Sequence, residues 1–297
     1  MTARVLVTGA TGLIGPPTVE ALAGAGFEVV TVGRRAPVAS SRHLDADLLD
    51  ATGRRAAVRA AGASHLLHLA WHGAADRWTG AANLDWAAAT IGLVRDFADR
   101  GGRRALCVGS CAEYDWAEPL LSEQSPLRPR TIYGKAKAAT GTLLTGTAPA
   151  LGITLAWARI FFCYGPEEPP GRLLGDLVRG LRLGQRVACT DGRQERDFLH
   201  AADVGRALAA VLASPLDGAV NIGSGHATPV RQLIATAAEL MGRPDLIDLG
   251  ARPRPADDPD RLVADVTRLA TTGFTPRYDL WSGLADAIAR TASEGRA

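Results

Sequence analysis

A tyrosine and a lysine stand four residues apart in Tyr133-Gly134-Lys135-Ala136-Lys137. On a helix, this spacing places Tyr133 and Lys137 on the same face. A phenol titrates near pH 10, so proton transfer at neutral pH needs a shift of about 3 pKa units, or about 4 kcal/mol. A cation about 4 Å away supplies about 4 kcal/mol at an effective dielectric of 20. We predict that Tyr133 is an acid or base whose pKa Lys137 lowers. The weaker alternative is an ordinary surface pair.

The lysine content of the chain favours the catalytic interpretation. Of the 33 basic residues only Lys135 and Lys137 are lysines, and both fall in this segment. A compact ammonium group can contact a ribose hydroxyl and a phenol where a guanidinium group fits poorly. Lys137 is therefore predicted to be catalytic, and Lys135 receives no role.

Ser110 is the third candidate for chemistry. It follows an apolar run at residues 104–109 that is typical of a buried strand. In doubly wound sheets, ligands bind beyond the carboxyl ends of the strands. A hydroxyl group there can hydrogen-bond a carbonyl that is being reduced and share its developing charge with Tyr133. A turn serine is the plainer alternative.

A glycine-rich loop near the N-terminus is typical of a dinucleotide site. It follows the apolar run 4–8 and leads into a helical pattern. Glycines let the backbone approach a pyrophosphate, and the helix start presents free N–H groups to it. The predicted cofactor contacts here are Gly9, Thr11, Gly12, Leu13, Ile14 and Gly15.

The end of the second predicted strand bears on the choice of cofactor. A site for NAD usually carries an acidic residue there, but this chain has Arg34 and Arg35. Guanidinium groups suit the 2′-phosphate of NADP, so NADP is favoured over NAD, with a solvated loop as the alternative. Asp47 and Leu48 are predicted to contact the adenine, although a helix cap is another interpretation of the aspartate. Further cofactor contacts are expected from Leu69, Ala70 and Trp71.

These residues must be positioned by alternating strands and helices. Apolar runs predict strands at residues 4–8, 27–32, 65–70, 104–109 and 153–160. Alanine-rich helical patterns lie between them at residues 17–25, 50–61 and 85–100. We therefore expect an α/β fold, a doubly wound parallel sheet of the Rossmann type, at residues 1–165. A smaller C-terminal substrate lobe is expected at residues 166–297, with about 195–225 returning to the sheet.

Together the motifs resemble the extended short-chain dehydrogenase/reductase family, in its nucleotide-sugar epimerase/dehydratase branch. The resemblance rests on the glycine loop, Ser110, Tyr133 and Lys137, and on segments 159–166, 196–204 and 221–225. It implies that Arg196 and Arg254 grip the diphosphate of a nucleotide sugar. Trp71, Cys111, Glu113 and Phe162 are further expected substrate contacts.

Two departures from the family pattern affect the predicted reaction. Dehydratases of this branch carry Thr-Asp-Glu where this chain has Ser110, Cys111 and Ala112, and Glu113 lies one position late. Conventional dehydration is therefore not expected. Phe162 replaces a family asparagine, which removes a polar phosphate contact.

The resulting hypothesis is NADPH-dependent reduction of a keto group on a nucleotide-activated deoxysugar, of the 4-ketoreductase type. A nucleotide-sugar epimerase is the alternative, and a non-catalytic NADP-binding sensor is a third.

The net charge of +2 does not indicate a basic surface for binding nucleic acid. No apolar run reaches the length of a membrane helix, and no metal-ligand spacing is present. The N-terminus leads directly into the glycine loop, so we expect a cytoplasmic enzyme, with a homodimer left open.

Overall fold

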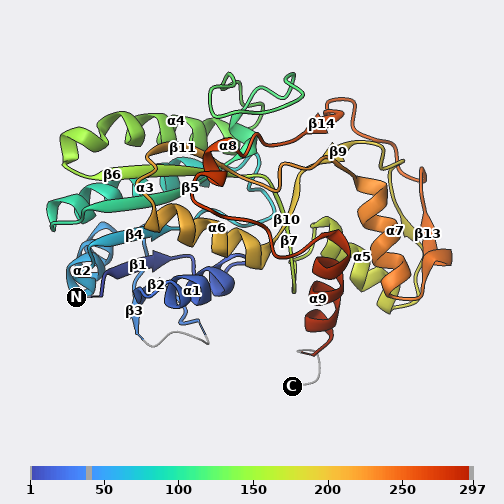
Figure 1. The fold of residues 1–297 in the computed structure, drawn as a ribbon, viewed down its shortest axis with the longest axis horizontal. Helices are drawn as coiled ribbons and strands as arrows, with labels where there is room; N and C mark the ends of the chain where they lie inside the picture. Colours follow the sequence, from blue (N-terminus) through green and yellow to red (C-terminus); the bar gives the residue numbers. More distant parts are fainter. Residues whose placement is uncertain (1, 38–41, 294–297) are drawn as a thin grey trace.

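A seven-stranded parallel sheet forms the larger part of the molecule (Figure 1). The computed structural model describes residues 2–37 and 42–293. The strand order is β11-β6-β5-β4-β1-β2-β3. The strands are β1 (Arg4–Thr8), β2 (Glu28–Gly33), β3 (His43–Asp45), β4 (His65–His68), β5 (Arg104–Ser110), β6 (Thr154–Ile160) and β11 (Gly218–Ile222). This is the predicted doubly wound fold, and the fold class is confirmed.

Helices cover both faces of the sheet because its strands are apolar on both sides. In β1, for example, Val5 and Val7 pack into one core cluster and Leu6 into the other. On the first face lie α1 (Gly15–Gly24) and α6 (Ala201–Ala213). On the second face lie α2 (Ala51–Ala61), α3 (Ala82–Asp99) and α4 (Ile132–Thr147). The predicted helices and strands are present, with bounds shifted by a few residues.

Most of the remaining elements form a smaller lobe beside the carboxyl ends of the strands (Figure 1). Its core is built by α5 (Leu173–Arg182), α7 (Val230–Leu240) and α9 (Leu280–Ser293). Its short strands are β7 (Phe162–Tyr164), β8 (Val187–Ala188), β9 (Glu195–Arg196), β10 (Phe198–His200), β12 (Thr228–Pro229), β13 (Ile247–Asp248) and β14 (Arg261–Leu262). The 3-10 turns are η1 (Cys111–Glu113), η2 (Ala148–Leu151) and η3 (Pro244–Leu246), and the short helix α8 (Thr267–Ala270) packs near β11.

Two segments of the second half return to the sheet. Helix α6 packs on α1, and β11 pairs with β6. Both lie within the region expected to return, while the division at residue 165 stays a prediction. No helix in the described part of the chain is long and apolar enough to cross a membrane. All four cysteines are free thiols.

Candidate active site

A cleft of about 1530 Å³ lies between the carboxyl ends of the strands and the smaller lobe. Most of the predicted site residues line it: Gly9, Thr11, Gly12, Leu13, Ile14, Arg34, Arg35, Asp47, Leu48, Leu69, Ala70, Trp71, Ser110, Cys111, Tyr133, Lys137, Phe162 and Arg196. Three predicted residues do not line it: Gly15, Glu113 and Arg254. The cleft thus joins the predicted cofactor loop to the predicted catalytic residues.

The glycine loop holds its shape through positions that exclude a side chain. Gly9 has φ of 70°, and a Cβ atom there would lie 2.6 Å from the backbone nitrogen of Ala70. A Cβ atom on Gly15 would lie 2.4 Å from the carbonyl oxygen of Ala10. Gly15 therefore supports the loop by close packing, and its direct contact with a cofactor stays a prediction.

Tyr133 lies in the first turn of α4, close to Ser110. The helix begins because the Thr131 hydroxyl, at the N-cap, accepts a hydrogen bond from the Gly134 nitrogen (3.0 Å). The Tyr133 ring packs edge-on against Trp78, with centroids 5.2 Å apart. Burial raises the pKa of Tyr133 to about 12, and hydrogen bonding with the Ser110 side chain opposes part of that rise. The phenol therefore keeps its proton at neutral pH.

Lys137 contacts a backbone carbonyl and an indole ring in this structure. Its Nζ donates to the carbonyl oxygen of Val108 (2.7 Å) and lies 3.7 Å from the ring centre of Trp71. Burial lowers the pKa of Lys137 to about 7. Here Nζ of Lys137 is directed to a backbone carbonyl and burial dominates the pKa of the phenol, so the expectation that Lys137 lowers the pKa of Tyr133 stays a prediction.

Trp71 is fixed by a buried asparagine. Its indole nitrogen donates to Oδ1 of Asn83 (2.9 Å), and Nδ2 of Asn83 donates to the carbonyl oxygens of Arg77 (2.8 Å) and Gly80 (2.9 Å). The asparagine thus anchors the loop between β4 and α3. As a result, the indole stays over the lysine at the wall of the cleft.

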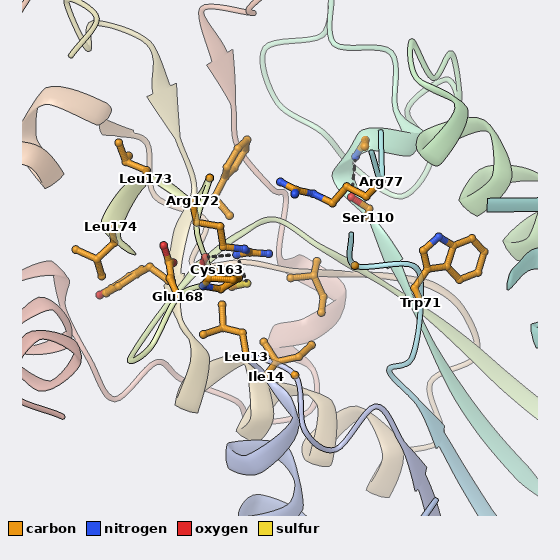
Figure 2. A pocket seen from close by; sticks show the side chains of 18 of the residues that line it. Leu13, Ile14, Trp71, Arg77, Ser110, Cys163, Glu168, Arg172, Leu173 and Leu174 are labelled. Carbon is orange, nitrogen blue, oxygen red and sulfur yellow. Dashed lines mark hydrogen bonds between the residues drawn. The ribbon is translucent and has the colours of Figure 1, made fainter. Parts of the chain in front are cut away.

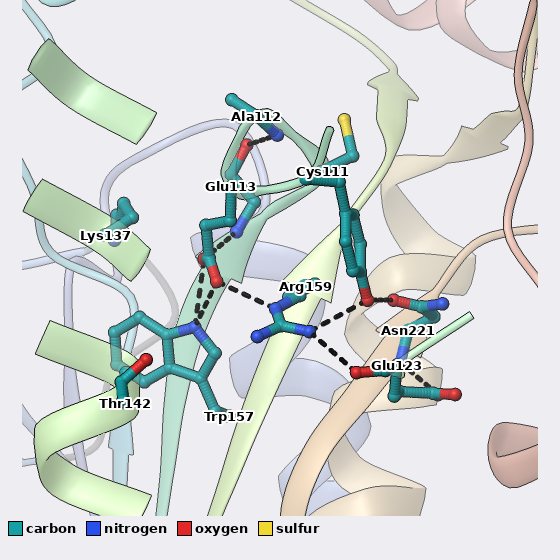
Figure 3. A network of polar contacts seen from close by, with 12 residues as sticks. Cys111, Ala112, Glu113, Glu123, Lys137, Thr142, Trp157, Arg159 and Asn221 are labelled. Atoms are coloured by element: carbon teal, nitrogen blue, oxygen red, sulfur yellow. Dashed lines mark hydrogen bonds and ion pairs between the residues drawn. The ribbon is translucent and has the colours of Figure 1, made fainter. Parts of the chain in front are cut away.

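Glu113 faces the protein interior (Figure 3). The carboxylate is fully buried and accepts hydrogen bonds from the Ser110 nitrogen (2.8 Å), the Trp157 indole nitrogen (2.9 Å) and Nε of Arg159 (2.8 Å). The Arg159 bond is also a buried ion pair. The predicted substrate contact of Glu113 is therefore corrected: its carboxylate holds the exit of β5, and with it the backbone of Ser110.

Two glycines make room for the Trp157 indole. A Cβ atom on Gly109 would lie 2.2 Å from the indole nitrogen and 2.4 Å from Oε1 of Glu113. A Cβ atom on Gly141 would lie 2.6 Å from the indole ring. Strand β5 and helix α4 therefore approach β6 closely enough to enclose Trp157 and the carboxylate.

The predicted diphosphate contacts lie at the other side of the cleft. Arg196 lines the cleft and forms an ion pair with Asp258, whereas Arg254, which does not line it, pairs with the same aspartate (3.2 Å). The Phe162 ring lies 5.4 Å from the Arg196 guanidinium carbon and packs edge-on against Phe198. An apolar surface thus stands beside Arg196, where the family has an amide.

Arginines that no sequence motif indicated also line the cleft, among them Arg77 and Arg172. Figure 2 shows Arg172 near Leu13, and Arg77 beside Ser110. Arg172 donates to the carbonyl oxygen of Cys163 (3.4 Å). In a chain with 33 basic residues, no spacing marks these two, because both lie in loops whose paths only the fold defines.

Comparison with known proteins decides the family. Residues 5–223 match the model of the NAD dependent epimerase/dehydratase family. The chain belongs to this family. It is 30% identical to a dTDP-glucose 4,6-dehydratase of Streptomyces griseus, over 97% of this chain and 94% of the relative. It is 29% identical to a UDP-glucose 4-epimerase of Streptomyces lividans, over 94% of each chain.

The solved structures agree with this assignment. The structure of MoeE5 in complex with UDP-glucuronic acid and NAD is 32% identical, with a TM-score of 0.85, and covers 98% of this chain and 100% of the other. The predicted membership of the extended short-chain dehydrogenase/reductase family is confirmed, and this family member is an enzyme of the NAD(P)-dependent oxidoreductase type.

Proposed function

We propose that this family member uses NADPH to reduce a keto group on a nucleotide-activated deoxysugar, as 4-ketoreductases do. The observation that carries the proposal is the Tyr133 phenol, which lines the cleft together with Ser110 and is hydrogen-bonded with the Ser110 side chain. Reduction of a carbonyl needs a proton donor, and a phenol whose pKa is about 12 is protonated at neutral pH. Ser110 orients the carbonyl oxygen, and Tyr133 delivers the proton to it.

The residues beside Ser110 do not favour dehydration. Cys111 and Ala112 stand where dehydratases carry an acid and a base, and both are buried. Burial raises the pKa of Cys111 to about 12, so it stays a neutral thiol. Together with the apolar Phe162, these side chains make a wall suited to a sugar that lacks a hydroxyl group.

Features at several places in the cleft support the binding of a dinucleotide. The glycine loop has no room for side chains at Gly9, and Arg34 and Arg35 line the cleft after β2. NADPH would supply the hydride. The loop would hold its pyrophosphate, the two arginines its 2′-phosphate, and Asp47 and Leu48 its adenine. NADP rather than NAD is part of the proposal, although relatives such as MoeE5 were solved with NAD.

Epimerisation is the second candidate function. It is favoured by the similarity to a UDP-glucose 4-epimerase over most of both chains. An epimerase oxidises its substrate and then reduces the keto group again. Reduction alone is preferred because Arg34 and Arg35 line the cleft where an NAD site usually carries an acidic residue. A sensor without chemistry is disfavoured because Ser110, Tyr133 and Lys137 all line the cleft.

The test is turnover of NADPH with nucleotide-linked 4-keto-6-deoxysugars. We expect NADPH oxidation and a reduced sugar product, and we expect Tyr133→Phe to lower kcat about 10²- to 10⁴-fold with little change in cofactor affinity. Tyr278→Phe is the matched control, because it removes a phenol that does not line the cleft. This variant should keep the kcat of the unchanged protein. Intact turnover in Tyr133→Phe would show that the mechanism is wrong. Interconversion of UDP-hexoses without net NADPH oxidation would assign an epimerase.

A homodimer and a cytoplasmic location complete the proposal. Leu84 on α3 and Leu143 on α4 are exposed apolar side chains on two helices that pack together, which supports a contact with a second copy. The mass of the protein in solution, measured by light scattering, tests the dimer. Fractionation of the source cells tests the location.

A further inference from the structure

The two predicted diphosphate-binding arginines share one carboxylate of the protein itself. Asp258 divides its oxygens between them: Oδ1 forms an ion pair with Arg196 Nη2, and Oδ2 pairs with Arg254 Nε (3.2 Å). Arg254 also donates to the backbone carbonyl of Asp258 (2.6 Å) and pairs with Asp260 (2.8 Å). A single carboxylate thus stands where a bound diphosphate is expected to lie.

Asp258 also separates one arginine from the cleft. Arg196 and Asp258 line the cleft, whereas Arg254 does not. The Arg196 side chain is 5% exposed and the Asp258 side chain 24%. The loop that carries Asp258 is tethered, because Arg130 Nη1 donates to the carbonyl oxygen of Asp257 (2.9 Å). The aspartate is therefore a built part of the cleft wall.

We propose that Asp258 sets the anion selectivity of the substrate cleft, by holding both guanidinium groups until a diphosphate replaces it. This inference rests on the proposed function, since it takes Arg196 and Arg254 as substrate contacts. A ligand enters by displacing the carboxylate, which then moves into solvent. A ligand that engages both arginines must replace both ion pairs of this carboxylate.

The physical reason is the cost of leaving a guanidinium group unpaired. Arg196 is buried, so removing its carboxylate without replacement leaves an uncompensated charge. A monophosphate replaces Asp258 at one arginine, whereas the two phosphates of a nucleoside diphosphate can engage both as bidentate acceptors. Asp258 therefore weakens the binding of a diphosphate, which must replace both ion pairs, more than that of a monophosphate, which replaces one. This aspartate acts on selectivity without taking part in hydride or proton transfer.

The experiment compares the holoenzyme with Asp258→Asn and Asp258→Ser by calorimetry at constant ionic strength. The probes are inorganic pyrophosphate, UDP, dTDP and UMP. We expect both variants to bind pyrophosphate and the nucleoside diphosphates about tenfold tighter than the unchanged protein, which is about 1.4 kcal/mol. The UMP affinity should rise by less, because UMP displaces one ion pair instead of two, so the preference for UDP over UMP widens. Asp257→Asn removes the same charge from the exposed neighbouring side chain and should change none of these affinities.

Two outcomes separate this inference from the proposed function. If pyrophosphate and UDP bind the Asp258 variants no more tightly than the unchanged protein, the inference is overturned, whatever the substrate. If pyrophosphate binds more tightly to the variants while UDP and dTDP bind to no form, the inference stands and the nucleotide part of the proposed function fails. An equal gain in Asp257→Asn would also overturn it, because a general charge effect would then explain the result.

Discussion

Arg34 and Arg35 follow β2 at the edge of the cleft, and both side chains are exposed. Because a 2′-phosphate carries about two negative charges, the pair should discriminate NADP from NAD. We predict that Arg34→Ala with Arg35→Ala raises the Kd for NADP about 10- to 100-fold and leaves the Kd for NAD within about twofold. Titration of both cofactors by fluorescence measures this.

The matched control for the cofactor experiment is Arg59→Ala. Arg59 is an exposed arginine on α2 that does not line the cleft, so its loss removes charge without removing a contact. Equal weakening of NADP and NAD in the double variant would contradict the proposed preference for NADP. A loss of NADP affinity in Arg59→Ala would show that net charge alone is responsible.

The sequence located individual residues well where a motif carried them. Ser110 and Tyr133 could be placed in one cleft, because strand ends and helix starts meet at the same edge of a parallel sheet. The direction of the Lys137 ammonium could not be predicted, since it depends on the Val108 carbonyl and the Trp71 ring. The inward turn of the Glu113 carboxylate required Arg159, a partner 46 positions away.

At the scale of elements, helices α1 and α6 pack closely against each other on one face of the sheet. A Cβ atom on Gly205 of α6 would lie 2.7 Å from the carbonyl carbon and oxygen of Pro17 in α1. Backbone atoms cannot move aside cheaply, so overpacking follows. We predict that Gly205→Ala lowers the free energy of unfolding by about 1–3 kcal/mol, as measured by urea denaturation.

Gly146 provides the comparison within another helix. It lies on α4, and a Cβ atom there would meet nothing within 4 Å. Gly146→Ala should therefore be neutral or stabilise the protein by up to about 1 kcal/mol, through helix propensity alone. Similar destabilisation by both substitutions would show that the contact between α1 and α6 is not responsible.

The long helices and strands of the sheet lobe could be predicted because the apolar residues of each recur with the spacing of a helix or a strand. Helix α2 shows why bounds moved only slightly: Asp50 caps it through the nitrogens of Thr52 and Gly53, and Gly62 ends it at φ of 55°. The smaller lobe lacks such local signals. Its strands β8, β9, β12, β13 and β14 have two residues each and pair across long separations, as β9 does with β12 and β14.

At the scale of the whole molecule, acid stability depends on a buried histidine that joins β1, β4 and α3. Thr8 Oγ1 accepts hydrogen bonds from two backbone nitrogens, so its own hydrogen goes to His68 Nδ1 (2.7 Å). His68 Nε2–H then donates to Thr90 Oγ1 (2.9 Å). The ring is therefore neutral, and burial lowers the pKa of His68 from 6.5 to about 3.

The direction in which pH changes the stability follows from the protonation of His68 in the folded and unfolded states. Between about pH 6.5 and 3, the unfolded chain binds a proton at His68 that the folded chain does not. The contribution of His68 to the free energy of unfolding is therefore greatest above this window and decreases as the pH is lowered through it. We predict a loss of about 2 kcal/mol by about pH 5 from this residue alone. Urea denaturation across this range, with His68→Asn, should show a shallower pH slope.

The control for the pH experiment is His226→Gln, which changes an exposed histidine. It should keep the pH slope of the unchanged protein. An unaltered slope in His68→Asn would show that other groups cause the acid sensitivity. Because the threonine partners lie on separate elements, a loss at this one ring should appear as cooperative unfolding of the sheet lobe.

The enclosure of Trp157 has a consequence for how this protein can vary during evolution. Any side chain at Gly109 collides with the indole and with Glu113, and any side chain at Gly141 collides with the indole. Glu113 in turn is compensated by Arg159. These five positions are expected to be inherited together. A descendant that replaced Trp157 with a small residue would be released from the glycine at 141, whereas Glu113 would still require the glycine at 109.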